Sequence, residues 1–195
     1  MSASTHPQRE SGQASPIYVV MVAGLLFLAL AFFAVGQAGA TRNGAQSAAD
    51  AAALAAARES RDQFTLDGLD LDSLTDLFDG GLIGDFNGCQ ASHSYAGQNK
   101  ADVVDCFPLG DGRWGFRVDV VSRNAVGDTV LPGTDALHAD ATATAVVVPA
   151  CTFEPADKKN SPSPGSLDCD GVDLDLDPND LPDMSDLFKV RLAED

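Results

Sequence analysis

The sequence predicts a membrane-anchored α+β protein, in which one long N-terminal helix is followed by a small disulfide-bonded domain containing an antiparallel hairpin. Three observations lead to this fold class. An apolar run occupies residues 17–36, and an alanine-rich segment without proline continues it to residue 64. Two segments of alternating apolar and polar residues then follow among four cysteines, and such alternation is typical of strands.

The charge and length of the chain exclude several classes of protein. The 195 residues include 12 Lys and Arg against 29 Asp and Glu, which gives a formal net charge of −17. Nucleic-acid binding depends on a basic surface that releases counterions, so no nucleic acid is expected as a partner. Outside the apolar run the chain has room for a small core only, which excludes a large catalytic barrel or a doubly wound sheet.

The apolar run predicts a transmembrane helix over residues 16–36, preceded by a short cytoplasmic tail over residues 1–15. Twenty helical residues span about 30 Å, the thickness of the hydrocarbon core of a bilayer. An alternative is signal-peptidase cleavage after Ala40, because residues 38–40 form a small-x-small site. Cleavage there would release a secreted or surface-exposed acidic binding module.

The composition beyond the apolar run predicts its orientation in the membrane. All four cysteines and all but one of the acidic residues lie after residue 36. An even number of cysteines without a Cys-x-x-Cys motif fits an oxidising, extracytoplasmic compartment. We therefore expect the lipid bilayer as one partner, with the N-terminus in the cytoplasm and the C-terminal domain on the extracytoplasmic side of the membrane.

Residues 37–64 predict a helical stalk that continues the membrane helix. Alanine dominates this segment and is the strongest helix former. Small residues recur at every fourth position, a spacing that allows another helix to approach closely. The alternative is that the stripe reflects alanine content alone. The candidate helix-packing residues are Ala40, Gly44, Ala48, Ala52 and Ala56.

The segment from residue 11 to residue 60 resembles the N-terminal segment of TadE/TadG-like proteins of the tight-adherence (Flp) pilus assembly system. The resemblance rests on a Gly-Gln pair before the membrane run and an alanine-rich block after it. Its residues are Gly12, Gln13, Arg42, Ala45, Gln46, Ala48, Ala49, Asp50 and Leu54. The resemblance implies a minor pseudopilin-like or assembly component, with other Tad/Flp pilus-assembly proteins as partners of its N-terminal helix.

One departure from the family pattern concerns processing of the N-terminus. Processed pilins and pseudopilins of this system place a glutamate at the fifth position after the cleaved glycine. Here the fifth residue after Gly12 is Ile17. The resemblance therefore implies an unprocessed, TadG-type member that remains anchored.

Residues 65–195 are expected to form the acidic extracytoplasmic domain. Period-two alternation predicts strands over 114–121 and 138–148, joined as a hairpin across the Gly- and Pro-containing segment 124–134. Alanines occupy one face of the second strand, so this face can lie on a helix. A third short strand is expected over 188–193. A long helix with a small twisted sheet is broadly a pilin-like plan.

Four cysteines permit three disulfide pairings. Pairing of neighbours joins Cys89 to Cys106 and Cys151 to Cys169, and it is the pairing we favour. The alternative joins Cys106 to Cys151 and Cys89 to Cys169, because the former two flank the hairpin at matching distances. Residues 155–166 contain three prolines and several small polar residues, which predicts an exposed loop between the last two cysteines.

No sequence pattern indicates catalysis, and we expect neither an enzyme nor a cofactor. The motifs Gly-x-Ser-x-Gly, Gly-x-Gly-x-x-Gly and Gly-x-x-x-x-Gly-Lys-Ser/Thr do not occur. The histidines are scattered at His6, His93 and His138, without metal-binding spacing. His138 and Asp140 share a strand face, a surface pair more typical of structure than of catalysis. Residues 168–186 are rich in aspartate, but their spacing does not fit a calcium-binding EF-hand loop, so we expect a solvated acidic stretch.

Overall fold

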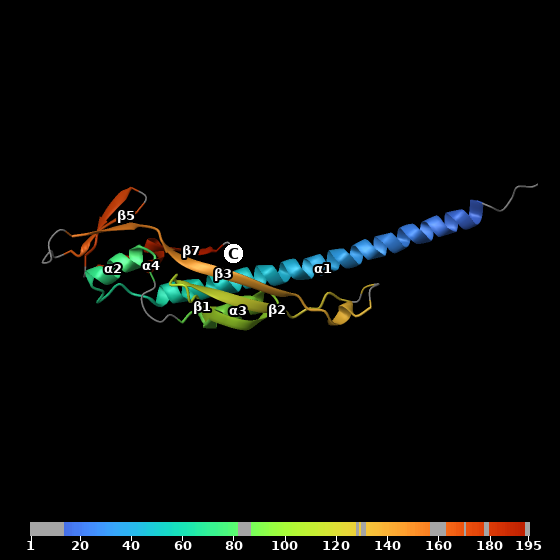
Figure 1. Ribbon diagram of the computed structural model, residues 1–195, viewed down its shortest axis with the longest axis horizontal. Coiled ribbons are helices and arrows are strands. Elements are labelled where there is room, and N and C mark those ends of the chain that lie inside the picture. Colours follow the sequence, from blue (N-terminus) through green and yellow to red (C-terminus); the bar gives the residue numbers. More distant parts are fainter. Residues whose placement is uncertain are drawn as a thin grey trace, which may run out of the picture.

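The computed structural model describes residues 14–81, 87–127, 129, 132–156, 163–169, 171–177 and 180–193. A single long helix projects from a small α+β domain, and the domain packs along its C-terminal half (Figure 1). The helices are α1 (Ala14–Gln63), α2 (Leu71–Phe78), α3 (Cys89–Gln98), the 3₁₀ helix η1 (Thr134–Ala136) and α4 (Met184–Leu187). The strands are β1 (Ala101–Pro108), β2 (Gly115–Ser122), β3 (Asp140–Pro149), β4 (Thr152–Pro155), β5 (Gly165–Cys169), β6 (Val172–Asp175) and β7 (Phe188–Leu192).

Helix α1 confirms that the apolar run and the alanine-rich segment form one continuous helix. It comprises 50 residues, which corresponds to a length of about 75 Å. Almost every residue before Ala45 is exposed, except for a narrow stripe, whereas most residues from Ala45 to Ser60 are buried. The C-terminal half of the expected stalk is therefore part of the domain core.

The main sheet is antiparallel and has the strand order β1-β2-β3-β7. The β2–β3 hairpin and β7 confirm three strands that alternation predicted. Strand β1 was not predicted, because its alternation is interrupted by a register shift between Val103 and Asp105. The alanine face of β3 packs on α1 as expected, and Ala143 and Ala145 belong to the same core cluster as Ala52 and Ala56.

A second sheet has the strand order β4-β5-β6 and includes part of the aspartate-rich stretch. Residues 172–175 are all exposed, as expected of a solvated acidic stretch, but they are also ordered as β6 against β5. The side chains of Leu167 and Leu176 are buried, and each anchors the acidic segment around it to the core. The carboxylates of these segments stay in water. Most of the predicted loop 155–166 lies outside the described residues.

Two disulfides join the elements in the pairing of neighbours. Cys89 of α3 is bonded to Cys106 of β1, and Cys151 before β4 is bonded to Cys169 of β5. Each closes a short chain segment, with sequence separations of 17 and 18. In the chain-entropy model each such loop contributes about 3 kcal/mol to stability.

Candidate functional site: the anchoring helix and its docking face

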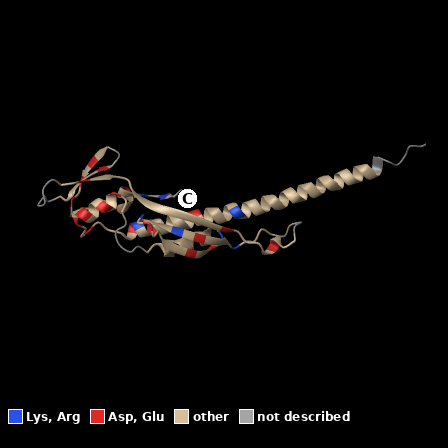
Figure 2. Cartoon of the chain, viewed as in Figure 1, with Lys and Arg blue, Asp and Glu red and all other residues tan. Residues whose placement is uncertain are grey.

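The N-terminal half of α1 is apolar, and nearly all of its side chains are exposed. Figure 2 shows no charged residue on it before Arg42, and large side chains such as Phe27 and Phe32 are 66% and 76% exposed. Only 6% of its most apolar 18-residue window is buried, so it is not the core helix of a soluble domain. It is long and apolar enough to cross a bilayer, where such side chains meet lipid.

The five candidate helix-packing residues fall into two groups. Ala48, Ala52 and Ala56 are fully buried against the sheet and α3 of their own chain. Ala40 and Gly44 are exposed. The small side chains of the first group let the domain approach the helix backbone. Only the second group is open to another protein.

The residues that carry the family resemblance largely form the face that receives the domain. Ala45, Ala48 and Ala49 are buried, Asp50 and Leu54 are half-buried, and Arg42 is exposed. Gly12 and Gln13 lie outside the described residues. The alanine-rich block therefore has a packing role within the chain.

Gln46 fixes the position of the sheet along α1. Its Nε2 donates to Asp50 Oδ1 at 2.9 Å and to the Thr142 carbonyl oxygen at 3.2 Å. One amide thus bridges the next turn of the helix and the first half of β3. This contact sets the level of β3 on the helix.

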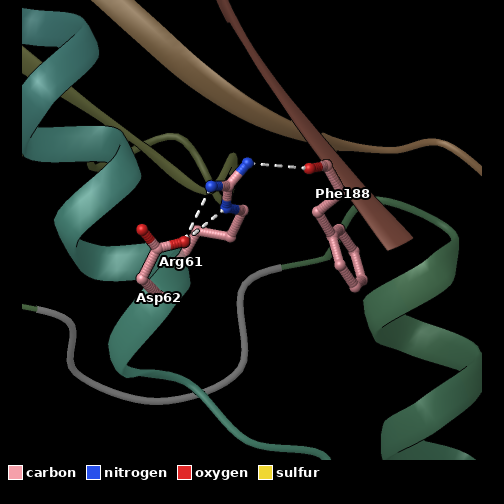
Figure 3. Close-up of polar contacts among 3 residues, drawn as sticks. All are labelled: Arg61, Asp62 and Phe188. Carbon is pink, nitrogen blue, oxygen red and sulfur yellow. Dashed lines mark hydrogen bonds and ion pairs between the residues drawn. The ribbon is translucent and has the colours of Figure 1, made fainter. Parts of the chain in front are cut away.

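The C-terminal end of α1 is held by polar contacts with the domain. Trp114 Nε1 donates to Ser60 Oγ at 2.8 Å inside the core. Arg61 Nη1 donates to the Phe188 carbonyl oxygen at 3.2 Å, and Nη2 lies 2.7 Å from Asp62 (Figure 3). A hollow of about 540 Å³ lies beside Arg61, between the end of α1 and the segment before α4.

Helix α3 docks on α1 through a contact that the sequence did not reveal. Ala91 N donates to Glu59 Oε2 at 2.7 Å. A Cβ atom at Gly88 would lie 2.0 Å from the Ala56 carbonyl oxygen, so only glycine fits at this crossing. A glycine directly before Cys89 indicates that another element passes close to the backbone there. The sequence does not show that this element is α1.

The two histidines of the described residues and the carboxyls with a lowered pKa lie at the surface. His138 Nδ1 lies 2.6 Å from the Ser122 carbonyl oxygen, to which it donates, and His93 is exposed. His6 lies outside the described residues. A hydrogen bond from Arg123 lowers the pKa of the exposed Asp102 carboxyl, and one from Arg113 lowers the pKa of Asp111. Such shifts are typical of exposed ion pairs.

The acidic residues show no metal-binding arrangement within the described part of the chain. Nowhere in that part do three or more His, Cys, Asp or Glu side chains come together to hold an ion. Asp170, in the middle of the aspartate-rich stretch, lies outside it. The disulfides use all four cysteines.

Comparison with known families identifies the anchoring segment. Residues 12–59 match the model of a family described as putative Flp pilus-assembly TadE/G-like. This segment is therefore similar to the TadE/G-like family. The match covers the apolar half of α1 and the alanine-rich docking face, and it stops short of α2 and all of the strands.

The family match does not extend to the domain that follows this segment. No curated protein matches the chain, and no solved structure matches it.

Proposed function

We propose that the chain is a single-pass membrane component of a bacterial Flp (tight-adherence) pilus or of a related secretion apparatus. It is a minor pseudopilin-like or assembly protein that acts by association of its helix with other assembly proteins. No turnover is involved in this role. The proposal combines the TadE/G-like segment with the two unlike halves of α1.

The observation that carries the proposal is the sharp change in the surroundings of α1. Its first half is apolar and bare, and its second half is the central element of a disulfide-bonded domain. A helix built in this way couples a folded domain rigidly to a bilayer. Such coupling suits a protein that positions a domain beside an assembly complex.

The two disulfides support the topology that we propose. Both join elements of the folded domain, and disulfides persist in the oxidising space outside the cytoplasm. We therefore propose that the N-terminus lies in the cytoplasm and the domain on the extracytoplasmic side of the bacterial cell membrane. The carboxylates face water at that side of the membrane.

The contact with other assembly proteins is placed on the exposed part of α1 between the bilayer and the domain. Ala40 and Gly44 lie one turn apart on this part, and neither has a large side chain. Small residues at this spacing let a second helix approach closely. The buried members of the stripe are unavailable to a partner because their own sheet covers them.

Fractionation of cells that produce the full-length protein tests the anchor. We expect the intact chain in the membrane fraction, resistant to alkaline extraction, with its domain degraded by protease added to spheroplasts. A mature protein that begins at Thr41 would contradict the anchor. It would support the released acidic binding module instead.

Site-specific crosslinking tests the partner contact. A photo-reactive amino acid at Gly44 should capture another envelope protein of the pilus system, identified by mass spectrometry. The same amino acid at Arg42 is the matched control, because this position is also exposed but lies about 200° around the helix from Gly44. Equal capture from both positions would argue against a specific helix contact.

A further inference from the structure

Strand β7 is an edge strand of the main sheet, and one side of its backbone has no partner strand in the described part of the chain. Ala193 N donates to the Thr144 carbonyl oxygen at 2.9 Å, in line with the β3–β7 register. The hydrogen-bonded pairs of an antiparallel ladder recur at every second residue, so Arg191 also directs its backbone groups toward β3. The backbone N–H and C=O groups of Val190 and Leu192 therefore point outward from the edge of the sheet.

A contact of Phe188 supports this alternation. Phe188 lies two residues before Val190, and its carbonyl oxygen accepts from Arg61 Nη1 at 3.2 Å (Figure 3). This carbonyl group therefore faces away from β3 and is satisfied by α1. The outward backbone groups of Val190 and Leu192 have no such contact with any described residue. They are open to a further strand.

The edge is basic although the chain as a whole is strongly acidic. The sequence has 12 Lys and Arg against 29 Asp and Glu, yet the two charged residues of β7 are the exposed Lys189 and Arg191 (Figure 2). Both lie on one face of the strand, and Arg191 forms no ion pair with a described residue. Val190 and Leu192 lie on the other face, where Leu192 is 39% exposed.

A hollow of about 440 Å³ borders the same strand. Its lining includes Arg113 and Arg191, together with the apolar side chains of Val146 and Leu192. The hollow offers space for a side chain beside the open backbone groups. Addition of a strand to a sheet edge uses both features, because main-chain hydrogen bonds provide affinity and pockets for alternate side chains provide specificity.

We propose that the free edge of β7 is a docking site for an extended segment of another protein, in which Asp or Glu alternates with apolar residues. The segment adds a further strand to the main sheet through the outward backbone groups of Val190 and Leu192. Its carboxylates lie beside Lys189 and Arg191, and opposite charges on neighbouring strands are stabilising. Its apolar side chains extend the face that carries Leu192. This contact is separate from the helix contact of the proposed function.

The charges argue against β7 of a second copy as the occupant. Two β7 strands paired antiparallel around Val190 would set Lys189 opposite Arg191, and like charges directly opposite each other are destabilising. Strand β6 has the required alternation over Val172–Asp175, but it belongs to the second sheet, at the end of the domain far from the apolar half of α1 (Figure 1). Copies held side by side in one bilayer, as in the proposed function, would present β6 and β7 at different levels. The occupant is therefore a different protein.

Binding of a synthetic peptide to the full-length protein in detergent tests the site. The probe is a short, fluorescently labelled peptide of alternating Asp and Val, and the control peptide has Lys in place of Asp. We expect the anisotropy of the acidic peptide to rise to saturation and the basic peptide not to bind. Amide hydrogen exchange at Val190 and Leu192, measured by NMR, should become several-fold slower with the acidic peptide bound.

Two variants separate the backbone contact from the charges. Val190→Pro removes an N–H group that makes no bond to β3, so the sheet keeps its ladder while the peptide should bind several-fold more weakly. Arg191→Glu should weaken binding to a similar degree. Arg42→Glu is the matched control, because it makes the same change of net charge at an exposed position of α1 and should bind as the wild type does. Circular dichroism verifies that each variant is folded.

Absence of binding by the acidic peptide overturns the proposal, as does equal binding by the wild type and Arg191→Glu. Binding without slower exchange at Val190 and Leu192 also overturns it, because the peptide then lies elsewhere. Oligomers of the wild type that Arg191→Glu dissociates, without binding of the peptide, would identify a second copy as the occupant. All of these outcomes leave the membrane anchor unaffected, since the anchor is tested by fractionation.

Discussion

At the residue scale, the packing of α3 on α1 depends on the absence of a side chain at Gly88. We expect Gly88→Ala to destabilise the domain by about 1–3 kcal/mol, because the added methyl group meets the backbone of Ala56, which cannot rotate away. Thermal unfolding of the full-length protein in detergent, followed by circular dichroism, measures the loss.

The same substitution at Gly44 is the control. A Cβ atom there has no neighbour within 4 Å, and alanine in a helix is favoured over glycine by up to about 1 kcal/mol. Gly44→Ala should therefore leave the melting temperature unchanged or raise it. Equal melting temperatures for the wild type and Gly88→Ala would show that the crossing is looser than described.

The ion pair between Arg123 and Asp102 gives a second prediction for single residues. Arg123 Nη2 donates to Asp102 Oδ1 at 2.7 Å, and this bond lowers the pKa of the carboxyl. In Arg123→Ala we expect the Asp102 pKa to rise toward its ordinary value. Titration of the side-chain carboxyl carbons by NMR measures it, with Asp111 as the control because its own partner is Arg113.

The sign of the pH dependence follows from the lowered pKa. The folded carboxyl stays ionised to lower pH than the unfolded one, so the pair stabilises the fold above the ordinary pKa. That contribution is lost as the pH falls through the folded value. Both side chains are about half exposed, so the effect on stability is small. An unchanged Asp102 titration in the variant would contradict the pairing.

At the scale of elements, the small side chains on the buried face of α1 set the distance between helix and sheet. We expect Ala52→Leu to destabilise the domain by about 1–3 kcal/mol, because its position is fully buried beside the β-strands. Ala40→Leu is the control, since Ala40 is exposed, and it should leave stability unchanged while reducing crosslinking at Gly44. Chemical denaturation measures both; equal stability of the two variants would contradict the close packing.

The elements that sequence predicted are those with one dominant period. The apolar run and the alanine-rich segment could only be helix, and most of β2, the first half of β3 and β7 alternate between apolar and polar residues. Strand β1 was missed because its eight residues contain no run of alternation, and its register with β2 shifts between Val103 and Asp105. Helix α2 was missed although Leu74, Leu77 and Phe78 have helical spacing and Asp70 caps it, accepting from Ser73 N at 2.8 Å. Its alternating leucines and aspartates concealed that signal.

At the scale of the whole molecule, the sequence predicted the anchor and the domain but not how they meet. The end of the apolar run shows where the lipid-facing residues end, so the sequence alone predicts the boundary of the membrane helix near residue 36. Alanine is compatible with both a free stalk and a buried docking face, so its role depends on the sheet that covers it. The level of β3 on the helix required the contact of Gln46 with Thr142, which joins residues 96 apart in sequence.

The shared core of helix and domain predicts which fragments fold. Residues 41–195 retain every buried position from Ala45 onward, so this fragment should be soluble, form both disulfides and unfold cooperatively. Residues 65–195 lack the buried alanines and Ser60, the partner of Trp114, so they should expose the apolar face of the sheet and fail to unfold cooperatively. Disulfide mapping and calorimetry of the two fragments measure this difference. Cooperative unfolding of the shorter fragment, with native disulfides, would mean that α1 is only a stalk, and the rigid coupling between bilayer and domain would be lost with it.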